Sequence, residues 1–325
     1  MATNVGAVWK TVKEIKLDDI RASAAFALKV AVIGTEDEIV WLQEHLRGET
    51  AHPGDIRRAT DALRLFEIPL GEDRLKTVNE CTIACLSPLA AANIKDQGMA
   101  VTIPLYTIGN EGEWEHFKRE LLDTRWDLHL PLGRNLPGLR SDVLEYIIVN
   151  MSLVNAEVAV VSAAFSKLLP PGIGPIYPTM QFGDTVILTK NQVMLAFRIA
   201  GACGLPIDIV HRKFEVLSII AGGLGWRALA RGAAGMLPAI GVVLKGAFAY
   251  AGTYAVGKAL AHFFNTGRRM ARAEERRLYR EAFETGRARA TEIVGRAFKR
   301  PGRFRRRGNQ GIPIRTGTDD PPQLG

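Results

Sequence analysis

A long stretch with almost no charge, residues 222–257, constrains the fold more than any other feature. Its 36 residues include nine glycines and nine alanines, and Lys245 is the only charged residue after Arg231. Residues 232–257 are nearly apolar over 26 positions, whereas a transmembrane helix needs about 20. Pro238 divides them, because a proline kinks or breaks a helix. We therefore expect a Gly/Ala-rich hydrophobic hairpin over 232–257, inserted in a membrane or tightly bound to one; a tightly packed soluble bundle is the alternative.

Small residues within the same stretch favour close helix packing. Four alanines recur at four-residue spacing, which places them on one helix face: Ala247, Ala251, Ala255 and Ala259. A lysine at the centre of a membrane span costs roughly 2.5–3.5 kcal/mol, which apolar neighbours can offset. Lys245 therefore does not exclude insertion.

The net positive charge of the chain is confined to the segment that follows. The chain has a net charge of +8, yet residues 265–307 alone hold 15 basic and 5 acidic residues. An Arg-rich helical arm over 267–300 suits the anionic headgroups of a cytoplasmic leaflet. A solvated helix with internal Arg–Glu pairs is the second interpretation. Nucleic acid is the least favoured partner, because few aromatic residues interleave the arginines and no known reading module is present.

The first third of the chain alternates between strand and helix patterns. Residues 27–33 form an apolar, β-branched run typical of a buried strand, and Thr35 and Glu38 have the spacing of a helix capping box. A second strand over 82–86, a helix from Pro88 and a strand over 101–105 follow. This alternation predicts a small parallel sheet.

The loop after the first strand has no phosphate-binding motif. A P-loop needs a second glycine and a lysine, whereas Gly34 is followed by Thr35 and then Glu36, Asp37 and Glu38. Carboxylates at the start of a helix repel a phosphate. We expect a structural α/β layer, a degenerate Rossmann-like or GTPase-like domain, and no cofactor.

Other searches for chemistry also give no site. Cys81 and Cys85 lack a second pair at zinc spacing, the histidines are scattered, and a Gly-x-Ser-x-Gly motif is absent. Residues 189–192 resemble the guanine-reading motif of GTPases only in the wrong order. We expect them near a helix N-terminus capped by Asp184 or Thr185. No catalytic, cofactor-binding or metal-binding residue is predicted, and the three cysteines favour a reducing compartment.

The expected organisation has five parts. They are an N-terminal segment (1–23), the α/β domain (24–112), a helical module (113–266), the Arg-rich arm (267–300) and a disordered tail (301–325). Within the module we expect helices over 114–122, 139–169, 184–203 and 207–224.

Patterned small and polar residues in the helical module resemble a known family. They lie between Leu136 and Gly267: Asn155, Asp184, residues 188–192, Gly204-Leu205-Pro206, Gly222-Gly223, Trp226-Arg227, residues 237–241 and residues 249–257. This part resembles the YcjF-like family of bacterial membrane-associated domains of unknown function, often fused to or encoded beside GTPase domains. The resemblance implies association with membranes and with a GTPase.

Nine residues of the helical module are candidate structural or interaction residues. They are Asn155, Asp184, Lys190, Asn191, Gln192, Arg231, Pro238, Lys245 and Thr253. If the polar ones are buried they should pair with one another or with backbone, because an unpaired buried polar group costs roughly 1–3 kcal/mol.

Taken together, these patterns predict a non-catalytic protein at the cytoplasmic membrane, with the bulk of the chain in the cytoplasm. Two other classes stay open. One is a divergent nucleotide-binding, GTPase-like enzyme, and the other is a soluble helical scaffold.

Overall fold

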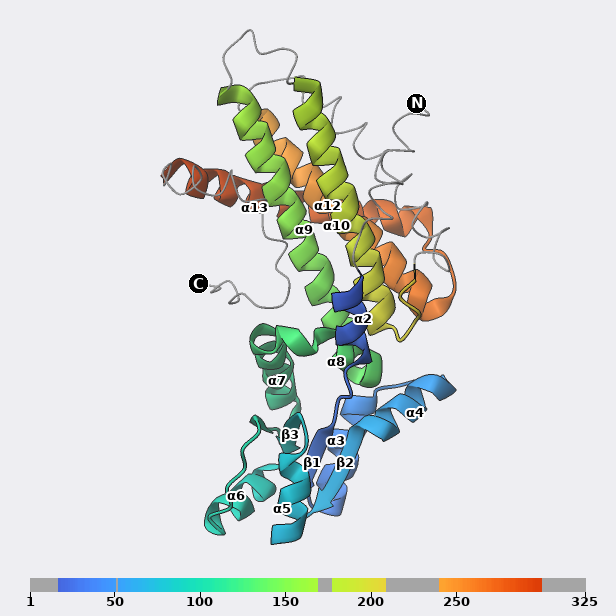
Figure 1. Cartoon of the computed structure of the whole chain (residues 1–325), viewed down its shortest axis with the longest axis vertical. Helices are drawn as coiled ribbons and strands as arrows, with labels where there is room; N and C mark the ends of the chain where they lie inside the picture. The colour runs from blue at the N-terminus through green and yellow to red at the C-terminus, as the bar shows by residue number, and fades with distance from the viewer. Residues whose placement is uncertain (1–16, 51, 169–176, 209–239, 300–325) are drawn as a thin grey trace. The chain divides into compact units, whose positions relative to one another are not determined.

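The computed structural model describes residues 17–50, 52–168, 177–208 and 240–299 and combines a four-stranded parallel sheet with long helices (Figure 1). The chain divides into two compact units. Among the described residues, the α/β unit comprises Asp19–Leu144 and Gly201–Leu205, and the helical unit comprises 17–18, Glu145–Ala200, 206–208 and 240–299. The predicted combination of a small parallel α/β layer with a helical part is confirmed. The division falls at residue 144, later than the expected residue 112, so the helix around Trp114 belongs with the sheet.

The sheet has the strand order β2-β1-β3-β4, and all neighbours are parallel. Its strands are β1 (Val30–Gly34), β2 (Leu63–Glu67), β3 (Ile83–Leu86) and β4 (Leu105–Thr107). The central strands β1 and β3 are buried at every residue, which explains their continuous apolar sequences. Ile33 of β1 lies between Phe66 of β2 and Leu86 of β3 in the register.

The edge strands differ from the prediction. No strand was expected at β2, where the charged residues Arg64 and Glu67 interrupt the apolar pattern. The strand expected over 101–105 begins only at Leu105. The reason is local: the backbone N–H of Thr102 donates to Oδ1 of Asn79 at 2.8 Å.

Helix caps place the turns between strands and helices. The helices of this unit are α2 (Asp18–Ala25), α3 (Glu36–Arg47), α4 (Pro53–Ala62), α5 (Glu72–Asn79), α6 (Pro88–Asp96), α7 (Glu111–Thr124), the 3-10 turn η1 (Trp126–Leu128) and α8 (His129–Asn135). The predicted capping box of α3 is confirmed, with the Thr35 backbone N–H donating to Glu38 Oε2 at 2.9 Å. Ser87 caps α6 and Asn110 caps α7.

Four long helices make up the helical unit. They are α9 (Pro137–Leu168), α10 (Tyr177–Ala202), α12 (Ile240–Thr266) and α13 (Arg272–Lys299). The first turns of α9 belong to the α/β unit. Helix α9 confirms the long helix expected over 139–169. The expected cap at Asp184 or Thr185 is wrong, because α10 begins at Tyr177 and both residues lie inside it.

The stretch predicted as a hairpin is helical in the part that the structure describes. Residues 240–257 belong to α12, which continues without a turn to Thr266. Pro238 and the rest of 232–239 lie outside the described residues, as do the helix expected over 207–224 and the tail 301–325. A turn within 240–257 is therefore excluded.

The Arg-rich arm packs against its neighbours. Ala282, Ala290 and Ile293 of α13 are buried in a core with Ala156 and Val160 of α9 and with residues of α12. A Cβ on Gly286 would lie 2.8 Å from Cβ of Tyr250, so the helices touch where α13 has no side chain. The inner face of α13 is thus structural.

Candidate functional site

The carboxyl edge of the sheet is the first place to look for a ligand site. In open α/β sheets, ligands bind beyond the carboxyl ends of the strands where the strand order reverses, here between β1 and β3. Glu38 fills this position: its Oε2 accepts the Thr35 backbone N–H at 2.9 Å and the Thr35 hydroxyl at 3.0 Å. A Cβ on Gly34 would lie 3.1 Å from Cβ of Glu38 and 3.3 Å from Cβ of Ser87.

Glu38 is held ionised in this environment. Burial opposes its ionisation, but hydrogen bonds from the Thr35 backbone and from the Ser87 and Thr35 side chains outweigh burial and lower its pKa. A negative carboxylate therefore takes the backbone N–H of Thr35 and repels a phosphate at this helix start.

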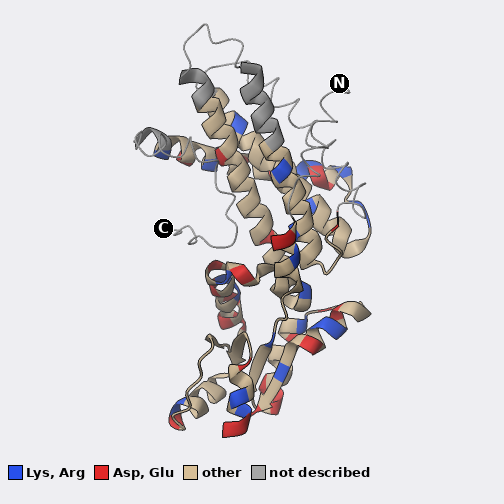
Figure 2. Cartoon of the chain, viewed as in Figure 1, with Lys and Arg blue, Asp and Glu red and all other residues tan. Residues whose placement is uncertain are grey.

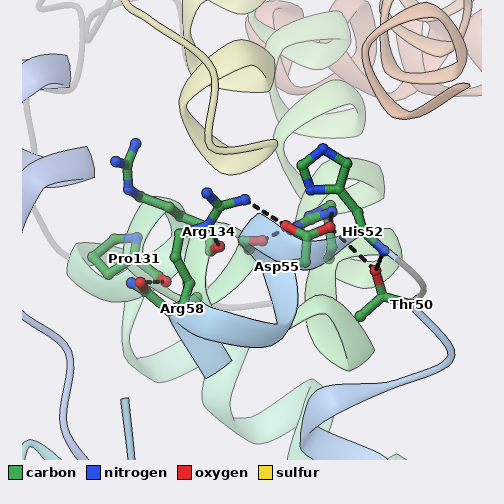
Figure 3. A network of polar contacts seen from close by, with 9 residues as sticks. Thr50, His52, Asp55, Arg58, Pro131 and Arg134 are labelled. Carbon is green, nitrogen blue, oxygen red and sulfur yellow. Dashed lines mark hydrogen bonds and ion pairs between the residues drawn. The ribbon is translucent and has the colours of Figure 1, made fainter. Parts of the chain in front are cut away.

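A buried charge cluster forms the densest polar contact of the α/β unit (Figure 3). Asp55 of α4 is buried and accepts two hydrogen bonds from Arg140 of α9, at 2.9 and 2.7 Å, and another from Arg58. Burial opposes ionisation of Asp55, but Arg140 and then Arg58 outweigh burial and lower its pKa to about 2. A carboxylate held in this way cannot take up a proton near neutral pH, so the cluster clamps the helices together and does no acid–base chemistry.

Two backbone contacts complete the clamp. Arg58 Nε donates to the carbonyl oxygen of Arg134 at 3.1 Å, and Arg140 Nε donates to that of Gly133 at 2.8 Å. Gly204, at φ +72°, lies so close to Arg58 that a Cβ would be 2.7 Å from its Nη2. The glycine of the Gly204-Leu205-Pro206 motif therefore serves this contact. The Arg134 side chain extends away from Asp55 (Figure 3), and burial together with the charge of Arg58 lowers its pKa.

Sequence reasoning missed this cluster. Asp55 and Arg140 are 85 residues apart, and neither belongs to a recognisable motif. The only local signal is Asp55 in the first turn of a helix, where a carboxylate is common.

Buried amides join the three apolar helices of the helical unit. Asn155 of α9 donates from Nδ2 to the Thr253 hydroxyl of α12 at 2.8 Å, and Asn191 of α10 donates from Nδ2 to Asn155 Oδ1 at 2.8 Å. The Thr253 hydroxyl in turn donates to the carbonyl oxygen of Ala249 at 2.8 Å. All three side chains are buried. We call them the amide triad; the pairing expected for Asn155 and Asn191 is confirmed.

Of the other six candidate residues, Gln192, Lys190 and Lys245 do not join the triad, and the side chains of the remaining three are not described. Gln192 is buried, and its Oε1 has no hydrogen-bond partner within the described part of the chain. Lys190 of α10 and Lys245 of α12 are half-buried. Asp184 lies in α10, but its side chain is outside the described part, and Arg231 and Pro238 fall in the segment 209–239 that is not described.

A second polar link between α9 and α12 was not predicted. Glu145 accepts the Tyr254 hydroxyl at 2.9 Å through Oε1 and pairs with Lys258 Nζ at 3.0 Å through Oε2. Tyr254 and Lys258 are four residues apart and share one face of α12. This spacing was visible in the sequence, but the partner on α9 was not.

One helix in the described part of the chain is long and apolar enough to cross a membrane. It is the segment Pro137–Ala164 of α9, with a mean hydropathy of 1.7, and half of its apolar window is buried inside the protein. Val154 on α9 and Ile187 on α10 are large apolar side chains that stay exposed. Figure 2 shows few charges along α9 and α10, in contrast to α13.

Neither metal-binding side chains, nor the cysteines, nor comparison with known proteins assigns a reaction to this chain. Among the residues that the structure describes, no group of three or more His, Cys, Asp or Glu side chains could hold a metal ion. Cys85 is buried in the sheet, and burial raises its pKa to about 12, so it is a neutral thiol. No family model, no curated protein and no solved structure matches this chain.

Proposed function

We propose that this chain is a non-catalytic, membrane-associated protein whose helical unit contacts the bilayer through α9. One observation carries the proposal: α9 is long and apolar enough to span, and only half of its apolar window is buried. Val154, in the middle of the helix, is 40% exposed. Contact with lipid removes this apolar surface from water, which stabilises the inserted state by roughly 25 cal/mol per Å².

The amide triad supports a membrane environment for these helices. An unsatisfied polar group in hydrocarbon costs several kcal/mol, so polar side chains in membrane helices pair across helix interfaces. Asn155, Asn191 and Thr253 pair in this way.

The basic outer face of α13 supports an orientation. Arginines next to an apolar segment favour the cytoplasmic side and attract anionic headgroups. We propose the cytoplasmic membrane as the location. The partner that the resemblance to the YcjF-like family suggests is a GTPase, with the α/β unit as a degenerate Rossmann-like or GTPase-like domain that contributes binding and no hydrolysis.

A nucleotide-binding enzyme is the alternative, and Glu38 disfavours it because its carboxylate accepts the N–H and hydroxyl of Thr35 and repels a phosphate at the start of α3. Titration with labelled GTP and ATP tests this directly. We expect no magnesium-dependent binding in the micromolar range; such binding would overturn the non-catalytic assignment.

A soluble helical scaffold is the second candidate, and the packing of α13 favours it. This helix covers part of α9 and α12 with a charged outer face, as the outer helix of a soluble bundle does. The two candidates differ in whether α9 contacts lipid.

Fractionation of cells that express the full chain separates these candidates. Salt screens exposed charges, with a Debye length of about 3 Å at 1 M, but does not weaken apolar insertion. We expect the protein to stay with membranes in high salt and to leave them only with detergent. Recovery in the soluble fraction at low salt would favour the scaffold.

A further inference from the structure

The apolar part of α12 ends at the charged residue Lys258. Lys258 pairs with Glu145 at 3.0 Å, and Glu145 is the last charged residue before the uncharged stretch 146–156 of α9. Beyond Lys258 come the adjacent half-buried aromatics Phe263 and Phe264, with ring centroids 5.8 Å apart. Phenylalanine is among the apolar residues that interfacial helices bury at the boundary between headgroups and acyl chains.

The turn after these aromatics is ordered and open. The Thr266 hydroxyl donates to the carbonyl oxygen of His262 at 2.7 Å and accepts the backbone N–H of Arg268 at 3.1 Å. Gly267 adopts φ +69°, and a Cβ there would meet no atom within 4 Å. Arg268 and Arg269 are both exposed. The backbone therefore presents these two arginines to solvent in a defined place.

Arginines at the two ends of the arm differ in their partners. In the second half of α13, Arg287 pairs with Glu284 at 3.0 Å and Arg289 pairs with Glu292 at 3.3 Å. Near the turn, the guanidinium groups of Arg268, Arg269, Arg272 and Arg276 form no ion pair with any residue that the structure describes. Two carboxylates, Glu274 and Glu275, lie in the first turn of α13, where the helix dipole stabilises them. The four arginines nearest the turn are therefore exposed and without ion pairs in the described part of the chain, whereas Arg287 and Arg289 further along α13 are paired.

We propose that the α12–α13 turn, residues 263–276, binds anionic lipid headgroups, with the arginines on the phosphates and the two phenylalanines at the interface. This inference deepens the proposed function and rests on it. The ligand class follows from the chemistry: guanidinium groups pair with phosphate oxygens, and neighbouring aromatic rings suit the boundary between headgroup and acyl chain. Duplex nucleic acid also offers phosphates, but it has no apolar layer for Phe263 and Phe264.

Vesicle flotation with matched double substitutions tests the site. The full chain is mixed with phosphatidylcholine vesicles, with and without phosphatidylserine. The test variant is Arg268→Gln with Arg269→Gln, and the control is Arg287→Gln with Arg289→Gln. Both variants remove two positive charges from exposed positions of the same arm, and unchanged helical circular dichroism verifies the fold. Arg272→Gln with Arg276→Gln is a second test variant.

Binding to the anionic vesicles should fall roughly thirty-fold in each test variant, since an arginine near an anionic surface contributes roughly five-fold. The control should change it only a few-fold. Equal losses in test and control variants, or no loss in either, would overturn the turn as the site while leaving membrane association intact. Failure of the wild type to float with both vesicle types would instead defeat the proposed function. Loss of duplex DNA binding with unchanged vesicle binding would assign the turn to nucleic acid.

Discussion

The side-chain amide of Asn155 and the hydroxyl of Thr253, 98 residues apart in the chain, form a buried hydrogen bond of 2.8 Å that joins α9 to α12. Asn191 of α10 donates to the other end of the same amide. Helices α9, α10 and α12 are therefore tied together by a buried polar link, which fixes their register as apolar contacts alone do not.

Thr253→Val should destabilise the helical unit by about 1–3 kcal/mol, because the buried Nδ2 of Asn155 would lose its acceptor while the side-chain volume stays similar. Thr253→Ser keeps the hydroxyl and serves as the control, with a smaller loss. Denaturant unfolding followed by circular dichroism measures both. Equal losses in the two variants would show that the hydroxyl contributes nothing.

Stability of the α/β unit should fall in acid between about pH 5 and pH 2. The pKa of Asp55 is about 2 in the folded protein and about 3.9 in an unfolded chain, so its stabilisation is complete above about pH 5 and is lost as the pH drops through 2. The lowered pKa corresponds to about 2.5 kcal/mol. Unfolding free energies measured across this range, in wild type and in Asp55→Asn, should converge at the acid end.

At neutral pH the same substitution, Asp55→Asn, should cost about 3 kcal/mol or more, because it leaves Arg58 and Arg140 without their carboxylate. Asp61→Asn on the same helix is the control; its ion pair with Arg57 is exposed and is worth about 0–1 kcal/mol. Similar losses in both variants would contradict the role of the cluster as a clamp.

Two glycines of α13 should respond oppositely to alanine. Gly286→Ala places a Cβ 2.8 Å from Cβ of Tyr250 and 3.0 Å from the carbonyl oxygen of Ala247, so we expect a loss of about 1–3 kcal/mol. Gly295→Ala meets no atom within 4 Å and should stabilise the helix by up to about 1 kcal/mol. Thermal unfolding of the two variants compares them. A stabilising Gly286→Ala would mean that α13 does not pack on α12.

Removal of the α3 cap should affect stability and nothing else. Thr35→Ala removes a hydroxyl that donates to Glu38, with an expected cost of about 0.5–2 kcal/mol. Thr60→Ala is the control, because that hydroxyl is bonded only to the carbonyl oxygen of Ile56 in its own helix. If Thr35→Ala left stability unchanged but abolished a measurable activity, the structural role of this loop would be wrong.

Features that depend on neighbouring residues were predictable from the sequence. The buried strand at β1, the capping box at Thr35 and the end of α3 at Gly48 all follow from patterns within a few positions. The sites of buried polar residues in α9 and α10 were also visible, because amides stand out in apolar helices.

Features that depend on distant partners were not predictable. The ion pair between Asp55 and Arg140 and the link from Glu145 to Lys258 join segments that only the fold brings together. The break expected at Pro238 lies outside the described residues, but the Gly/Ala-rich residues 240–257 form one continuous helix because their glycines serve helix contacts, such as Gly246 against Val160 and Gly257 against Ile148.

The central claim is that α9 contacts the bilayer. It is tested most directly by measuring how deep in the bilayer a fluorophore attached at position 154 lies. The three native cysteines are buried, so a single cysteine introduced by Val154→Cys can be labelled selectively with a fluorophore, with Arg57→Cys in the α/β unit as the control. In vesicles, we predict that nitroxides attached to lipid acyl chains quench the label at position 154 and that aqueous iodide quenches the label at position 57. Strong iodide quenching at position 154, without quenching by the lipid nitroxides, would contradict membrane contact through α9.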